Sequence, residues 1–365
     1  MEQISSKRKT GETIMNKYFN VSVASLLVVA LGSIGTAQSQ QRNLSAETAG
    51  PTGVPGQVMM HMADVLGEKK VADLQVAQGQ TLTNSVRNVA EGKTDIASGP
   101  IILTFLLDRG VGPYAKLGKK KGAELAANLR ALYPYNAGGF FGLFYTNKGY
   151  KSWADLKGKS IWNGPPRGAA LNNGRATLQM TAGLRDGKDY KGVQQNWGQL
   201  MTTLVDGSVD AFVLPVTWPH PYVTTMSAAG KVSVLSVPKA KFEGKLAKKL
   251  FGVPGNIPIV VDGKDLGYKG SLTLISEDGK LRGLGTAFTD LVHKKMSFKL
   301  AKAITATHIS TLGMLKKRTA FMDSVGLAEM DAVKSGFCGK SKLKYHAGAV
   351  AAWKEAGFNL PACAQ

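Results

Sequence analysis

The chain contains 365 residues, of which 44% are hydrophobic and 19% are charged, and 46 Lys and Arg against 25 Asp and Glu give a net charge of +21. This composition excludes a disordered chain, a collagen and a coiled coil. No stretch reaches the roughly 18 apolar residues of a spanning helix, which excludes a polytopic membrane protein. The positive charge attracts anions in general. Because the basic residues are scattered and not interleaved with aromatic residues, we expect no nucleic-acid partner.

Residues 1–39 have the pattern of a secretory signal peptide. Lys17 precedes an apolar run over Val21–Leu31, and small residues follow at the positions that a signal peptidase reads. The run is too short for a membrane anchor. We therefore expect a periplasmic protein cleaved near Ser39/Gln40. Translation is expected to start at Met15, because the residues before it mix acidic with basic side chains.

The two cysteines, Cys338 and Cys363, both lie in the C-terminal segment. Export places them in an oxidising compartment, and no His or Cys motif accompanies either one, which disfavours a free reactive thiol. We therefore predict a disulfide between them. Closing a loop of 25 residues stabilises the fold by about 3 kcal/mol in the chain-entropy model.

The segment after the signal peptide predicts a loop, two helices and two strands. A loop rich in Gly and Pro over residues 49–56 leads into a helix with apolar residues at helical spacing over Val58–Leu66. A strand follows at Leu74–Ala77. A second helix over Leu82–Ala90 ends at a glycine, and a second strand begins at Ile96.

The same order of elements occurs again downstream. A strand over Ser160–Trp162 leads into a second Gly-Pro loop at residues 163–168 and then into a helical stretch. A further helix around Leu200–Val205 ends at Gly207, and a strand follows at Ala211–Val213.

The spacing of the two copies is nearly equal. From the glycine of the Gly-Pro loop to the aspartate before the last strand there are 45 positions between Gly50 and Asp95, and 46 between Gly164 and Asp210. Strands that alternate with helices predict parallel sheets, and two such units predict an α/β fold of two lobes that face each other. Loops at the carboxyl ends of the strands form the ligand crevice, so the two Gly-Pro loops should converge on one cleft. The alternative is two unrelated α/β domains whose Gly-Pro loops are ordinary turns.

We assign residues 41–135 and about 262–365 to lobe 1, and about 136–240 to lobe 2. The region of about 241–261 is expected to recross between the lobes and act as a hinge. Beyond it, the pattern over Leu291–Ile304 predicts a helix that packs on the first lobe.

Several segments in this order and spacing resemble the TAXI-type solute-binding proteins of tripartite ATP-independent periplasmic (TRAP) transporters. They are Gly50–Gly53, Asn84–Ser98, Leu129–Pro134, Ser152–Lys159, Asn163–Pro166, Asp206–Phe212, Tyr345–Ala349 and Trp353–Gly357. The resemblance implies a type II periplasmic-binding-protein fold, in which two lobes close like a hinge on a central ligand cleft. It also implies a protein that captures a small organic anion, such as a dicarboxylate or a glutamate-like molecule, and delivers it to TRAP membrane permease subunits.

The chain departs from the family's pattern in both loops. Pro51 and Val54 make the first loop less rich in glycine, and the second loop carries Arg167 followed by Ala169 and Ala170, where small hydroxyl-bearing residues are common in relatives. Both departures touch the expected cleft and therefore bear on the identity of the ligand.

The expected chemistry of the cleft is the binding of a carboxylate. Both Gly-Pro loops lead into helix N-termini, whose free N–H groups and positive dipole attract an anion. Arg167 can add a bidentate contact, or it can be a solvated surface residue. Thr81 and Ser98 can orient the ligand or can cap local backbone groups, and Trp197 can cover the ligand or pack in the core. The candidate ligand-binding residues are Pro51, Thr52, Gly53, Val54, Gln80, Thr81, Ser98, Gly99, Pro165, Arg167, Gly168, Ala169, Trp197, Pro215 and Trp218.

Enzymatic signatures do not occur in the sequence. Gly158–Ser160 resembles the end of a P-loop, but position 153, where the leading glycine belongs, is Trp153. The five histidines are dispersed without zinc-ligand spacing, and no Gly-x-Ser-x-Gly elbow occurs. We therefore expect a monomer without catalytic residues, metal or cofactor.

Three other functions remain open from the residues alone. A receptor of the same fold can serve an ABC importer for aromatic sulfonates or pyrimidines. An exported hydrolase would need a nucleophile and base pair. A basic polyanion binder would need a contiguous charged patch and salt-dependent retention.

Overall fold

The computed structural model describes residues 42–323 and 335–365. The predicted signal peptide and its cleavage position near Ser39/Gln40 lie outside the described residues. Strands of the described part join one mixed sheet with a central order of β2-β1-β3-β11-β4-β7-β5-β6. No helix among the described residues has the length and the apolar content needed to cross a bilayer.

The first part of the chain forms a parallel unit with strand order β2-β1-β3, in which β1 pairs with both neighbours. Its elements are β1 (Arg42–Glu47), α1 (Val54–Glu68), β2 (Ala72–Ala77), α2 (Leu82–Ala90) and β3 (Ile96–Pro100), followed by α3 (Ile101–Arg109) and α4 (Gly118–Ala126).

The second unit has the order β6-β5-β7, which is the same arrangement of first, second and third strand. Its elements are β5 (Ser160–Gly164), α5 (Ala169–Ala182), β6 (Lys191–Gln194), α6 (Trp197–Thr203) and β7 (Ala211–Val216). The elements that follow are α7 (Pro221–Ala229), β8 (Val232–Leu235), α8 (Lys239–Phe242), α9 (Lys245–Phe251), β9 (Asn256–Asp262) and β10 (Leu272–Ile275).

Each unit contains the same set of hydrogen bonds between a serine of its first strand and the aspartate that precedes its third strand. We call this set a polar clasp. In the first unit, Ser45 donates its backbone N–H and its hydroxyl to the Asp95 carboxylate, at 2.8 Å in both cases. In the second unit, Ser160 donates the same two groups to the Asp210 carboxylate at 2.9 Å. Each aspartate N–H donates back to the serine hydroxyl at 3.1 Å. The equal spacing in the sequence therefore reflects one structural unit built twice.

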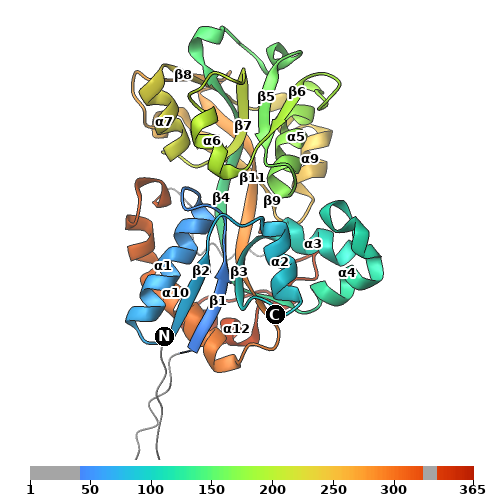
Figure 1. Cartoon of the computed structure of the whole chain (residues 1–365), viewed down its shortest axis with the longest axis vertical. Helices are drawn as coiled ribbons and strands as arrows, with labels where there is room; N and C mark the ends of the chain where they lie inside the picture. Colours follow the sequence, from blue (N-terminus) through green and yellow to red (C-terminus); the bar gives the residue numbers. More distant parts are fainter. Residues whose placement is uncertain (1–41, 324–334) are drawn as a thin grey trace, which may run out of the picture. The chain divides into compact units, whose positions relative to one another are not determined.

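Two long strands, β4 (Leu129–Tyr145) and β11 (Lys280–His293), connect the two units (Figure 1). The first part of β4 pairs with β11, and its last residues pair with β7 and β8. In the same way, β11 pairs with β9 through Lys280–Thr286 and with β3 through Phe288–Val292. The fold is thus the predicted α/β fold of two lobes, and two crossing strands join them.

The exact division into lobes remains a proposal. The pairing of β11 with both β9 and β3 favours a second crossing within β11, near the register shift between Gly285 and Ala287. Leu266 and Leu281 lie buried in the apolar cluster of the second lobe, so the chain is still in that lobe beyond residue 261. We therefore propose that the recrossing lies later in the chain than residues 241–261.

The predicted helix over Leu291–Ile304 is wrong in its first part. Leu291 belongs to β11, and the helix α10 (Phe298–Lys317) begins after Ser297, whose hydroxyl accepts a hydrogen bond from the Leu300 N–H at 3.3 Å. Residues 281–292 are buried throughout, so this strand shows no alternation that separates it from a helix.

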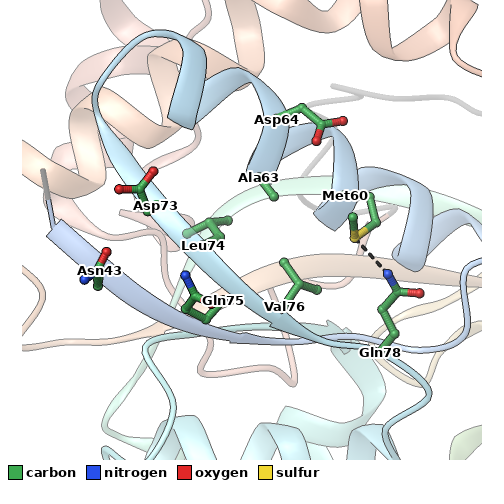
Figure 2. A pocket seen from close by; sticks show the side chains of 9 residues that line it. All are labelled: Asn43, Met60, Ala63, Asp64, Asp73, Leu74, Gln75, Val76 and Gln78. Carbon is green, nitrogen blue, oxygen red and sulfur yellow. Dashed lines mark hydrogen bonds between the residues drawn. The ribbon is translucent and has the colours of Figure 1, made fainter.

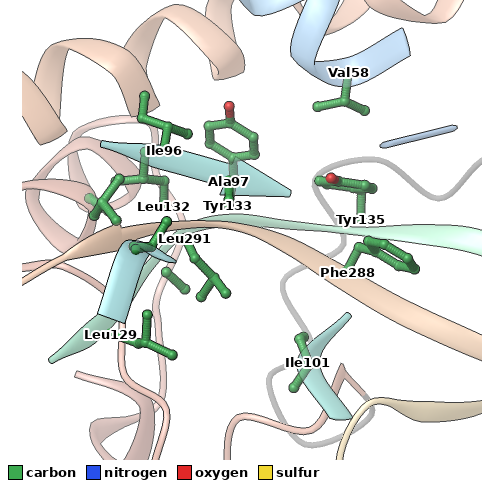
Figure 3. Close-up of a cluster of buried hydrophobic side chains, with 14 of the residues drawn as sticks. Val58, Ile96, Ala97, Ile101, Leu129, Leu132, Tyr133, Tyr135, Phe288 and Leu291 are labelled. Atoms are coloured by element: carbon green, nitrogen blue, oxygen red, sulfur yellow. The ribbon is translucent and has the colours of Figure 1, made fainter. Parts of the chain in front are cut away.

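The core of the first lobe surrounds β3, β4 and β11 (Figure 3). Side chains such as Val58, Ile96 and Leu132 are fully buried there. The same core holds one carboxylate, Asp290, whose oxygens accept hydrogen bonds from Ser98 at 3.0 Å and from Tyr133 and Tyr135 at 2.8 and 2.9 Å. Burial raises the pKa of Asp290 to about 6. Three donors on one carboxylate satisfy a charge that would otherwise be costly to bury.

The C-terminal segment returns to the first lobe and contains the predicted disulfide, Cys338–Cys363, with a Cα–Cα distance of 5.6 Å. The Ala131 N–H in β4 donates to Lys344 O at 2.9 Å, and the Trp353 indole donates to Leu132 O at 3.0 Å. The remaining elements are α12 (Ala347–Glu355) and the short 3-10 helices Gly112–Leu117, Thr146–Lys148, Trp153–Leu156, Gly263–Asp265, Ala320–Met322 and Ala362–Ala364.

Candidate ligand-binding site

Both Gly-Pro loops line one cavity of about 590 Å³. The first loop contributes residues 49–54, and the second contributes Pro165, Arg167 and Gly168. Residues from the crossing strands, among them Phe140 and Phe288, also line it. The volume is in the range of sites for small molecules. The loops meet as expected because each follows the carboxyl end of the central strand of its unit.

Four helices begin at this cavity without a side-chain cap. Their N-cap residues are Gly53 for α1, Thr81 for α2, Pro100 for α3 and Gly168 for α5, and none of the four helices has an acidic residue in its first turn. Two other helices that begin here are capped, α6 by the capping box of Asn196 and α7 by His220. The free N–H groups at a helix start favour an anion. Four such helix starts therefore lie at the cavity, with no anionic side chain in their first turns to neutralise them.

Glycine is required at two positions of the second loop. Gly164 has a φ of +137°, and a Cβ there would lie 2.8 Å from the backbone of Leu171. Gly168 has a φ of +104°, and a Cβ there would lie 3.3 Å from Thr83 Oγ1 in the first lobe. Both values of φ strain any residue with a side chain. The two glycines thus permit α5 to begin close to the cavity and close to α2.

The first Gly-Pro loop contacts the second unit at the cavity, and α5 contacts a crossing strand. The Thr52 and Tyr222 hydroxyls lie 3.3 Å apart, and Asn173 Nδ2 donates to Thr286 Oγ1 at 2.8 Å. These contacts join the first Gly-Pro loop to α7 and join α5 to a crossing strand.

Arg167 is the one charged side chain among the described residues that line the cavity. It is exposed and lies next to the N-terminus of α5. The only histidine of the lining, His220, is buried, and burial lowers its pKa to about 3, so the ring is neutral at ordinary pH. Its Nδ1 accepts a hydrogen bond from the Tyr222 N–H at 3.2 Å. Burial also raises the pKa of Tyr222, which keeps that phenol protonated. The fixed charge of the lining is therefore +1.

An apolar wall completes the cavity. Trp197 is half-buried and packs against Trp162 with a ring-centroid distance of 5.4 Å, so it belongs to both the core and the lining. Leu103 and Phe140 are buried, at 1% and 2% exposure. Such a wall can cover the apolar part of a ligand.

The model of the NMT1-like family matches residues 46–265, which is more than half of the chain. The chain belongs to the NMT1-like family. The match covers both Gly-Pro loops and both repeated units, apart from the first four residues of β1. No curated protein matches the sequence at a significant level.

Several solved structures are similar to this NMT1-like chain. The aliphatic sulphonate binding protein SsuA from Escherichia coli is 14% identical, with a TM-score of 0.44, over 80% of this chain and 83% of that one. A TRAP solute binding protein from Ralstonia eutropha with bound (S)-2-acetolactate is 14% identical, with a TM-score of 0.43, over 86% and 91%. A TRAP protein from Desulfovibrio salexigens with bound orotic acid is 12% identical, with a TM-score of 0.45, over 86% and 89%.

Most of the residues that the sequence singled out lie together in this NMT1-like protein. Those that line the cavity are Pro51, Thr52, Gly53, Val54, Gln80, Thr81, Pro165, Arg167, Gly168, Ala169, Trp197 and Pro215. The Thr81 side chain makes no capping hydrogen bond to α2.

Ser98, Gly99 and Trp218 are not among the lining residues. Ser98 is fully buried, donates to Asp290, and accepts from the Thr48 hydroxyl at 3.2 Å. Gly99 lies against the Leu291 side chain. Trp218 packs on Phe141 in the core of the second lobe. These three residues therefore belong to the core and not to the lining of the cavity.

The sequence did not single out several residues that line the cavity. Phe140, Thr286 and Phe288 reach it from β4 and β11, and nothing local in the sequence places these strands between the lobes. Thr83 lies in the first turn of α2, where the apolar period predicts a helix but gives no sign of a polar contact. Tyr222 follows β7, and its position after a parallel strand could have identified it.

A second cavity of about 460 Å³ lies between α1 and the edge strand β2 (Figure 2). Its lining includes the carboxylates Asp64 and Asp73 and no basic side chain. Gln78 donates to the Met60 sulfur across it at 3.0 Å. Its charge is opposite to that of the first cavity, and it contains no helix start. Among the described residues no group of three or more metal-ligating side chains occurs in either cavity.

Proposed function

We propose that this NMT1-like protein is a periplasmic, non-enzymatic solute-binding protein that captures a small organic anion in the first cavity. The observation that carries the proposal is the meeting of four uncapped helix N-termini at one cavity, with Arg167 beside the start of α5. Backbone donors that are already fixed in space bind an anion without an ordering cost.

Closure of the lobes is part of the proposal. A ligand that contacts both lobes stabilises the closed arrangement by the difference in its contacts between the two states. The Thr52–Tyr222 contact at the rim supports such closure, because it joins the first loop to the second lobe. A membrane transporter can then distinguish loaded from unloaded protein.

We further propose that the transporter is a TRAP permease. The support is the resemblance of the two loops and the C-terminal segment to TAXI-type proteins. An ABC importer is the alternative. Uptake of the captured anion into membrane vesicles of the source bacterium, with the purified protein added, tests the assignment. Uptake by a TRAP system requires an ion gradient and no ATP. Uptake that stops when ATP is removed would overturn the assignment to a TRAP permease.

The binding function is tested by a screen of organic anions against the purified protein, together with native mass spectrometry for retained small molecules. We expect at least one anion to bind at about micromolar affinity or tighter. Small-angle scattering with that anion should show compaction. If no anion binds, or if the scattering profile at saturation does not change, the proposed function is wrong.

Arg167→Ala is the matched variant for this test. Loss of a charge-assisted hydrogen bond should weaken binding of the anion by about tenfold or more. Arg109→Ala is the control, because Arg109 lies at the end of α3, outside the cavity, over the Phe105 ring. Equal affinities of the two variants would remove Arg167 from the site.

A further inference from the structure

On the basis of the proposed function, we infer that the ligand carries one anionic group and no ammonium group. We further infer that the Thr83 hydroxyl holds the anionic group where α2 and α5 begin. The ligand class is therefore a carboxylate or sulfonate on an apolar body. Three features of the cavity carry this inference: a buried hydroxyl, the charge of the lining and the distribution of apolar residues.

Thr83 has a buried hydroxyl without a partner. The residue is 6% exposed and lines the cavity, and its Oγ1 finds no hydrogen-bond partner among the described residues. It occupies the second position of α2, a helix of nine residues without a side-chain cap. A buried hydroxyl without a partner is costly, and an anion at the helix start would satisfy it.

The second lobe approaches Thr83 with another helix start. A Cβ on Gly168 would lie 3.3 Å from Thr83 Oγ1, so the N-cap of α5 faces the first turn of α2 directly. Arg167 is the neighbour of Gly168. One anionic group at this position can therefore contact both lobes, the Thr83 hydroxyl and a cation at once.

The charge of the lining excludes an ammonium group on the ligand. Among the described residues, the cavity lining contains Arg167 but no aspartate or glutamate. The histidine of the lining is neutral. An ammonium ion that leaves water needs an anionic partner, and its burial without one is unfavourable. A glutamate-like ligand, which the family resemblance implies, therefore fits the charges of this cavity poorly.

The rest of the cavity does not offer an equivalent second place for an anion. At the α1 start, the Thr52 hydroxyl already contacts Tyr222, and Pro55 in the first turn has no N–H to donate. The α3 start packs against Gly255, where a Cβ would lie 2.5 Å from the Ile102 N, and the α6 start is occupied by its own capping box. The remaining surface is largely apolar, with Trp197, Leu103 and Phe288 suited to the ligand's body.

Two matched series of probes test the ligand class by calorimetry on the purified protein. One is pentanoate, 5-aminopentanoate and glutarate, and the other is benzoate, 4-(aminomethyl)benzoate and terephthalate. Pentanesulfonate tests a sulfonate in place of the carboxylate, and glutamate is measured beside them. We expect the monoanion of at least one series to bind about tenfold or more tightly than its ammonium-bearing and dianionic partners.

Thr83→Val tests the position of the anionic group, because it removes the hydroxyl and keeps the shape of the side chain. We expect it to weaken binding of the monoanion by about tenfold. The control is Thr305→Val, since the Thr305 hydroxyl in α10 is likewise buried and without a partner among the described residues, yet does not line the cavity. Both substitutions remove an unsatisfied hydroxyl, so both variants should fold.

The outcomes separate this inference from the proposed function. Binding of glutamate, 5-aminopentanoate or glutarate as tightly as pentanoate overturns the ligand class and leaves anion capture standing. Equal affinities of Thr83→Val and Thr305→Val overturn the position of the anionic group. Failure of every probe also overturns the inference, while the proposed function is then judged by the wider anion screen and by scattering.

Discussion

At the scale of single residues, His308 is an unusual component of the first lobe. The ring is fully buried and stacks on Tyr133 with a centroid distance of 3.8 Å and an interplanar angle of 4°. Neither ring nitrogen finds a partner among the described residues. Burial, with a smaller contribution from His61, lowers the pKa of His308 to about 3. The native state therefore holds this ring uncharged.

His308→Leu should change the pH dependence of stability. In the unfolded chain His308 takes up a proton as the pH falls below about 6.5, whereas in the native state it does not. The buried ring therefore lowers the free energy of unfolding as the pH falls through this value. Between about pH 6 and pH 4 the free energy of unfolding of the wild type should fall, relative to the variant, by about 1.4 kcal/mol per pH unit. Urea unfolding of both proteins at pH 7.5 and pH 5 measures this difference. A parallel pH dependence of the two would contradict the neutral ring.

The residues that the sequence could identify are those in the two Gly-Pro loops. Their role follows from a local rule, since a loop after a parallel strand lies at the ligand edge of the sheet. Ser98 and Trp218 lie near the ends of strands as well, but their side chains point into the core. Ser98 donates a hydrogen bond to Asp290, and Trp218 packs on Phe141. The direction of a side chain at a strand end depends on packing from distant segments, which the local pattern does not contain.

At the scale of elements, the start of α1 depends on close packing of the first loop. A Cβ on Gly56 would overlap the Gly50 carbonyl and lie 3.0 Å from the Pro51 Cα. Gly198, in the first turn of α6 at the same cavity, has no atom within 4 Å of the corresponding point.

Gly56→Ala should therefore lower the free energy of unfolding by about 1–3 kcal/mol, because the loop backbone must move. It should also weaken anion binding, since the loop carries the N-cap of α1. Gly198→Ala is the control and should leave stability nearly unchanged. Chemical denaturation and calorimetry check both effects. Equal stability of the two variants would show that the first loop can shift without cost.

The repeated unit was the part of the fold that the sequence predicted best. The same order of elements occurs twice in the sequence, and each copy supports the prediction made for the other. The Ser45–Asp95 and Ser160–Asp210 clasps give the physical reason for the equal spacing. The crossing strands β4 and β11 could not be predicted in the same way. Both are buried along most of their length and therefore lack a period, and their partners are far away in the sequence.

At the scale of the whole molecule, the disulfide holds the end of the chain on the first lobe. Tyr345 and Ala364 share a backbone hydrogen bond of 2.8 Å, and β4 bonds to the same segment through Ala131. Cys338 and Cys363 therefore close a loop around contacts that connect the C-terminus to a crossing strand.

Replacement of both cysteines by serine should lower the free energy of unfolding by about 3 kcal/mol, the value for a closed loop of this length. Because the bridge lies outside the cavity lining, anion affinity at low temperature should stay within about twofold of the wild type. Urea unfolding and calorimetry measure the two quantities. An unchanged unfolding midpoint would mean that the C-terminal segment contributes little to the stability of the first lobe.

The two crossing strands have a consequence for the thermodynamics of the molecule. β4 and β11 each pair with strands of both lobes. Neither lobe therefore has a complete sheet without these two strands. The loss of order in one lobe unpairs strands on which the other depends. We therefore expect the protein to unfold as a single calorimetric unit, and we expect that a cut between the two halves yields no fragment that folds alone.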